Sequence, residues 1–132
     1  MTCFWQAIAS TLTSKEKRML GIRSGRPKEI VFQLKKVNEK IKVEHVLWNG
    51  SELSAQELRE HSTAIREYDA TGIYNGHLCG TCDSFLVLLC FALNWHVRHN
   101  YRGHTITYQR KRTAVPPRQV RFASNSGHFY CG

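Results

Sequence analysis

The feature that most constrains the fold is an unbroken run of nine apolar residues, FLVLLCFAL, at positions 85–93. A helix that spans a bilayer needs about 20 apolar residues, so this run is typical of a helix buried inside a domain. The chain has 132 residues, of which 42% are hydrophobic, and this is enough to surround such a helix with one core. We therefore expect a single domain over residues 1–132 with this helix inside it.

Helical periodicity precedes the apolar run. The spacing of apolar residues predicts a helix over residues 3–13 and another that begins at Pro27 after the break RSGRP. The second helix would bury one face, formed by Ile30, Val31, Leu34, Val37 and Ile41. The segment HVLWNG at positions 45–50 predicts a short extended piece that ends in a turn.

A capping box, Ser54 with Glu57, predicts the start of the next helix. Its inward stripe would consist of Leu58, His61, Ile65 and Tyr68. The glycine-rich segment 70–81 is expected to be a loop, after which Asp83 would cap the apolar helix.

After the apolar run the period changes from 3.6 to 2, which predicts strands. Four short segments show it: HVRHNY (96–101), HTITYQ (104–109), VRFAS (120–124) and HFYCG (128–132). Arg102–Gly103 suits a hairpin turn, and AVPPR a surface loop. Helices followed by strands predict an α+β fold in which helices pack on a small, mainly antiparallel sheet.

Cys3 lies where the first predicted helix begins. A thiol attacks as its thiolate, and both a helix N-terminus and a nearby histidine favour that negative charge. Of the seven histidines, His128 is the best placed, because it follows a Ser-Asn-Ser-Gly turn and opens the last predicted strand. This pattern indicates a cysteine nucleophile with a histidine base.

The chain resembles the ovarian-tumour (OTU) family of cysteine proteases, most of which are deubiquitinating enzymes. The similar segments occur in the family's order: TCFWQAIAS from Cys3, GTCDSFLVLLCFAL, HTITYQ and GHFYCG with His128. The resemblance implies a papain-like fold with Cys3 as nucleophile and His128 as base. No Asp or Asn follows His128 at the family's spacing, which implies a Cys–His dyad of the compact viral type, with Asn125 as the candidate third member.

The same resemblance implies acyl transfer without a cofactor. Backbone amides near Cys3, with Thr2 or Gln6, would stabilise the oxyanion. The implied substrate is ubiquitin or a ubiquitin-like modifier cleaved after its C-terminal glycine, with a viral polyprotein as a second candidate. The chain's last residue, Gly132, suggests the hypothesis that it is itself a product of such processing.

A metal site is the alternative chemistry. His77, Cys79 and Cys82 lie in one loop, and Cys-x-x-Cys is half of many zinc sites, with His96, His99, His128 or Cys131 as the fourth ligand. No second knuckle is present, so we expect no metal, and Cys82 and Cys90 are expected to pack as small hydrophobic residues.

The net charge of +9 leaves a second class of function open, a non-catalytic basic module, with or without zinc, that binds RNA or a protein. The basic clusters SKEKR, LKKVNEK and QRKRTAVPPRQVR are typical of solvated faces and a loop, and aromatic residues are not interleaved with them. No membrane span is expected. The sequence shows no secretory signal and has five cysteines, an odd number, which together indicate the cytoplasm.

Overall fold

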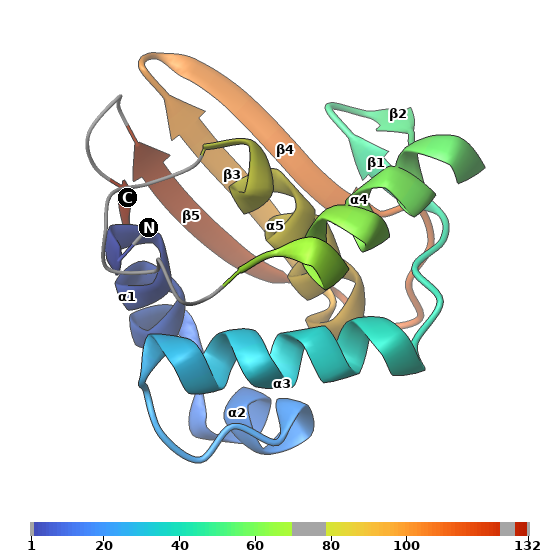
Figure 1. Ribbon diagram of the computed structural model, residues 1–132. Helices are drawn as coiled ribbons and strands as arrows, with labels where there is room; N and C mark the ends of the chain where they lie inside the picture. The colour runs from blue at the N-terminus through green and yellow to red at the C-terminus, as the bar shows by residue number, and fades with distance from the viewer. Residues whose placement is uncertain (1, 70–78, 125–128, 132) are drawn as a thin grey trace.

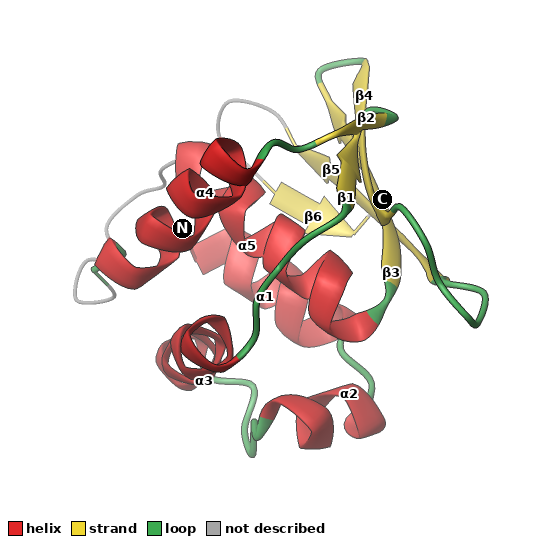
Figure 2. Ribbon diagram, turned by 90° about the vertical axis from the view of Figure 1, so that its right-hand side faces the viewer, coloured by secondary structure: helices red, strands yellow, loops and turns green. Residues whose placement is uncertain are grey.

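The computed structural model describes the backbone of residues 2–69, 79–124 and 129–131 and the side chains of residues 3–69 and 82–124. Within these ranges the chain has an α+β fold, with helices on one side of a six-stranded mixed sheet (Figure 1, Figure 2). The helices are α1 (Thr2–Thr11), α2 (Ser14–Leu20), α3 (Pro27–Lys40), α4 (Ala55–Glu67) and α5 (Cys79–Leu93). The strands are β1 (Val46–Trp48), β2 (Ser51–Glu52), β3 (Trp95–Tyr101), β4 (His104–Arg110), β5 (Arg118–Ser124) and β6 (Phe129–Cys131). The predicted α+β class is confirmed.

Helix α5 occupies the centre of the core, as the apolar run predicts. Every residue from Phe85 to Cys90 has at most 2% of its surface exposed, and the helix contacts α4, β3 and β4. The prediction that Asp83 caps this helix is wrong. Since α5 begins at Cys79, Asp83 lies one turn inside it, and its carboxylate accepts a hydrogen bond from the Tyr108 hydroxyl.

The sheet has the strand order β2-β1-β4-β3-β5-β6. Four of its five pairings are antiparallel, in agreement with the prediction, and the parallel pairing joins β3 to β5. The predicted β3–β4 hairpin is present: Arg102 (φ 51°) and Gly103 (φ 89°) both have the positive φ of a type I′ turn. This turn matches the twist of the strands on either side of it.

The first half of the chain follows the predicted helices with one addition. The first helix ends at Thr11 instead of residue 13, because Thr13 caps the unpredicted helix α2 through a capping box with Glu16. The capping box at Ser54 and Glu57 starts α4 as expected, and Ile65 and Tyr68 on its inward stripe are buried. The segment HVLWNG contains β1, and the Asn49–Gly50 turn leads into β2, which was not predicted.

In the part of the chain that the structure describes, no helix combines the length and apolar character needed to cross a membrane.

Candidate functional site

Cys3 is the second residue of α1 and is half-buried. It precedes two fully buried aromatic residues, Phe4 and Trp5, whose rings meet edge to face at 4.8 Å. The thiol is therefore held at the end of a helix whose next turn is anchored in the core. The N–H groups of the first helical turn point out of the N-terminal end, and the helix dipole favours negative charge there.

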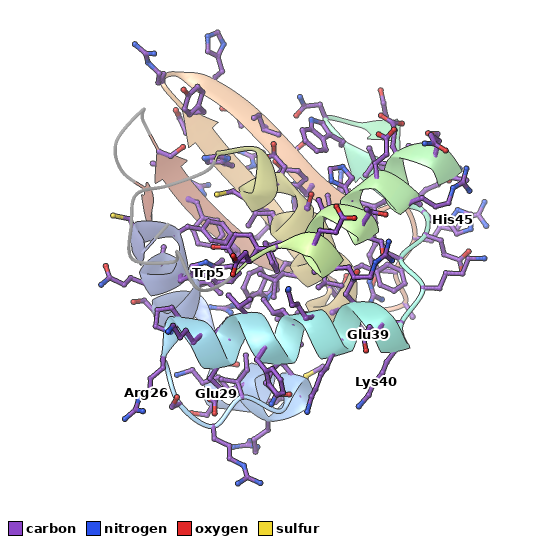
Figure 3. The ribbon with its side chains drawn as sticks, in the orientation of Figure 1. Trp5, Arg26, Glu29, Glu39, Lys40 and His45 are labelled. Atoms are coloured by element: carbon purple, nitrogen blue, oxygen red, sulfur yellow. The ribbon has the colours of Figure 1, made fainter. Side chains whose placement is uncertain are left out.

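Trp5 is one of the buried residues that anchor α1 in the core. Its ring packs edge to face on Phe85 of α5 at 4.7 Å, and its indole nitrogen donates a hydrogen bond of 3.4 Å to the Tyr68 hydroxyl at the end of α4. Figure 3 shows Trp5 directed into the interior of the molecule. Trp5 thus links the Cys3 helix to α5 and to the end of α4, and the helix also packs on α3 and β6.

The helix that carries Cys3 contacts β6, the strand that directly follows His128 in sequence. Strand β6 pairs antiparallel with β5, with Ala123 opposite Tyr130. His128 and Asn125 themselves lie outside the described residues. The structure therefore brings together α1, which carries Cys3, and β6, which follows His128 in sequence.

A partly buried hydrogen bond that was not predicted from the sequence lies at the end of β5. His99 on β3 is 6% exposed, and its Nε2 lies 2.5 Å from Oγ of Ser124, the last residue of β5. Burial lowers the pKa of His99, opposed in part by the negative charge of Asp83. This hydrogen bond holds Ser124, the last residue of β5, which lies four positions before His128 in the sequence. The alternation of Trp95, Val97 and His99 in the sequence is the signal that could have placed this histidine on the buried face of a strand.

Two further residues were predicted to help an oxyanion hole. Thr2 is the first residue of α1, and only its backbone is described. Gln6 is exposed and lies three residues after Cys3 on the same helix, where side chains are neighbours on the helix surface. The Gln6 side chain is therefore exposed on the same side of the helix as the Cys3 thiol.

The alternative metal site is only partly described. His77 and the side chain of Cys79 lie outside the described residues, as do His128 and the side chain of Cys131. Among the side chains that are described, no group of three His, Cys, Asp or Glu could hold a metal ion. Cys82 and Cys90 are both buried, as predicted, and burial raises the pKa of Cys90 to about 12.

A second histidine–hydroxyl pair lies between α4 and α5. His61 Nδ1 is 2.8 Å from Oγ of Ser84, and the imidazole stacks on Trp48. Burial lowers the pKa of His61, against the opposing effects of Asp83, Glu57 and Glu60. Ser84 lies inside a helix, where the surrounding amides are used by the helix itself, so no donors are available for an oxyanion and the pair has a structural role.

Comparison with protein-family models, with curated proteins and with solved structures found no match to this chain.

Proposed function

We propose that the chain is an OTU-type cysteine hydrolase that cleaves ubiquitin or a ubiquitin-like modifier after a C-terminal glycine. The observation that supports this most is the packing of α1 on β6, because the helix that carries Cys3 then lies beside the strand that follows His128 in sequence. A nucleophile at a helix N-terminus and a base on an adjacent strand is a recurring solution for thiol chemistry.

In this mechanism, His128 takes the proton of the Cys3 thiol, and the thiolate attacks the carbonyl carbon of the glycine. Amides at the start of α1, with Gln6 beside them, stabilise the negative charge that develops on the carbonyl oxygen. The tetrahedral intermediate collapses, the C–N bond breaks, and the imidazolium donates its proton to the leaving amine. Water, deprotonated by His128, then hydrolyses the thioester and restores the thiol.

We further propose that the enzyme acts in a compartment that keeps thiols reduced, such as the cytoplasm of a host cell. A viral polyprotein with glycine at the cleaved position is the second candidate substrate, because a narrow approach to a nucleophile accepts residues without a side chain. A non-catalytic binding module is the competing function.

The test is covalent capture by ubiquitin that carries an electrophile at its C-terminus. We expect the wild-type chain to form a one-to-one adduct that is lost in Cys3→Ala and strongly reduced in His128→Ala. Cys90→Ala is the matched control: its thiol is buried with a pKa of about 12, so the adduct should form unchanged. Absence of an adduct with the wild-type chain, or an adduct that persists in Cys3→Ala, contradicts the proposal.

A further inference from the structure

Charge is distributed very unevenly along this chain. Residues 1–83 contain twelve Lys or Arg and all ten Asp and Glu, whereas residues 84–132 contain seven Lys or Arg and no acidic residue. The second part forms β3 to β6, four of the six strands of the sheet. Of the net charge of +9, residues 84–132 therefore carry +7 and residues 1–83 carry +2.

One face of this sheet is not covered by any described helix. Figure 2 shows the five helices on one side of the strands, with the opposite face open. The residues of β3 that alternate with the buried Val97 and His99 point to the open face, as do their partners on β4 and β5. The surface that they form, here called the open sheet face, comprises His96, Arg98, Asn100, Thr105, Thr107, Gln109, Gln119, Arg121 and Ala123.

Two exposed arginines lie side by side at the centre of this face. Arg98 on β3 and Arg121 on β5 are directly opposite each other in the parallel register, on strands about 4.8 Å apart. No carboxylate in the described part of the chain forms an ion pair with either side chain, and like charges opposite each other destabilise a sheet. An anionic ligand would relieve this repulsion.

The rest of the open sheet face suits a phosphodiester backbone. Asn100, Thr105, Thr107 and two glutamines surround the arginines, and such amides and hydroxyls commonly donate to phosphate and sugar oxygens. Among the described residues, the exposed large apolar side chains are Met19, Phe32 and Val115, none of them on this face. The half-buried Leu47 on β1, which pairs with Gln109, lies at the margin of this face. A lipid surface or an acidic protein would favour large exposed apolar or aromatic anchors, and the described side chains of this face supply none.

We propose that the open sheet face binds the phosphate backbone of RNA, through Arg98 and Arg121, without regard to base sequence. Among the described side chains, no Phe, Tyr or Trp projects from the face to stack on bases, so binding depends on charge and on backbone hydrogen bonds. The surface is separate from Cys3, and its ligand does not depend on the proposed hydrolase activity.

The test measures binding of the full chain to a 20-nucleotide single-stranded RNA by fluorescence anisotropy between 50 and 200 mM salt. Arg98→Gln with Arg121→Gln should weaken binding about tenfold or more, because each arginine supplies charge-assisted hydrogen bonds. The slope of log affinity against log salt should fall in magnitude by about 1.4, since each phosphate contact on a single strand contributes about 0.7. Binding to oligo(U) and to a mixed sequence should be equal.

Arg26→Gln with Arg66→Gln is the matched control. It removes the same charge from exposed arginines in the helical layer, and Figure 3 shows Arg26 directed away from the molecule. The control should keep at least half of the wild-type affinity. Equal loss in both double variants, or no RNA binding at 50 mM salt, would overturn the proposal.

Two additional measurements cover the remaining outcomes. Single-stranded DNA of the same sequence tests whether the ribose hydroxyls contribute, and equal affinity would assign recognition to phosphate alone. Vesicles with anionic lipid and a polyglutamate peptide serve as competitors, and tighter binding to either would replace RNA as the ligand. Should the arginine double variant fail to fold, photo-crosslinking of RNA to wild-type protein decides, because adducts mapped outside β3 to β5 contradict the proposal.

Discussion

At the scale of single residues, the most informative side chains are two histidines, the half-buried His61 and the buried His99. Each hydrogen-bonds a serine hydroxyl, and burial lowers the pKa of each below its ordinary value of 6.5. A histidine that stays neutral in the folded chain but becomes protonated in the unfolded chain makes the unfolded state bind more protons. The free energy of unfolding must then fall as the pH drops below about 6.5.

We therefore predict that the free energy of unfolding decreases between pH 7.5 and pH 5.5, measured by urea titration. His61→Asn and His99→Gln keep a hydrogen-bonding atom near the position of the nitrogen that meets each serine, and the double variant should show a flatter dependence on pH. The carboxylates whose pKa is lowered, those of Glu29, Glu52 and Glu57, affect stability only nearer pH 4.5 and do not disturb this window. A pH dependence identical to that of the wild type would show that the two histidines are not its cause.

At the scale of elements, helix α2 is tied to the sheet through one buried carboxylate. Glu16 closes the capping box of α2 with Thr13, accepts a 2.6 Å hydrogen bond from the Trp95 indole nitrogen and forms a 2.5 Å ion pair with Arg118. Trp95 and Arg118 are register partners at the start of β3 and β5. One side chain therefore connects a helix of seven residues to both strands of the parallel pair.

We predict that Glu16→Ala lowers the free energy of unfolding by about 2–4 kcal/mol. Loss of the cap accounts for about 1 kcal/mol, and a buried indole N–H left without an acceptor for about 1–3 kcal/mol. Denaturant titration measures the change. Glu39→Ala is the control: Glu39 is exposed on α3 (Figure 3) and should change stability by no more than about 0.5 kcal/mol. Similar losses in the two variants would contradict the role given to Glu16.

At the scale of the whole molecule, the core lies between the helical layer and one face of the sheet. Strand β3 pairs with β4 on one side and β5 on the other, and its Trp95 and Val97 are fully buried. Strand β2, by contrast, is an exposed edge strand of two residues. Local opening requires little free energy where few buried contacts are lost.

Amide hydrogen exchange should therefore separate these regions. We predict that the amides in the middle of α5 and β3 exchange only through global unfolding, while those of the β1–β2 hairpin exchange at least about tenfold faster. Mass spectrometry or NMR under native conditions measures both sets in one experiment. Uniform protection across β1, β2 and β3 would contradict this view of the core.

Much of the fold follows from the sequence alone, because its signals are local. The capping box at Ser54, the start of α3 at Pro27, the Arg102–Gly103 turn and the burial of α5 depend on residues a few positions apart. Helix α2, which was not predicted, carries the same kind of local signal, the capping box of Thr13 with Glu16. Asp83 shows the limit of such signals, since any acidic residue near an apolar run resembles a cap until the true start of the helix is known.

The candidate site likewise has some features that are local in the sequence and others that depend on tertiary packing. Cys3 at a helix start, and His128 before a strand, are local features of the sequence. Contact between α1 and β6 depends on the strand order β3-β5-β6, which no short segment encodes. Only the tertiary structure pairs His99 with Ser124, Glu16 with Arg118 and Arg98 with Arg121, residues 23 to 102 positions apart. Local propensity and turn chemistry act within a few residues, whereas these partners are chosen by how the helices and strands pack around α5, and that choice exists only in the folded chain.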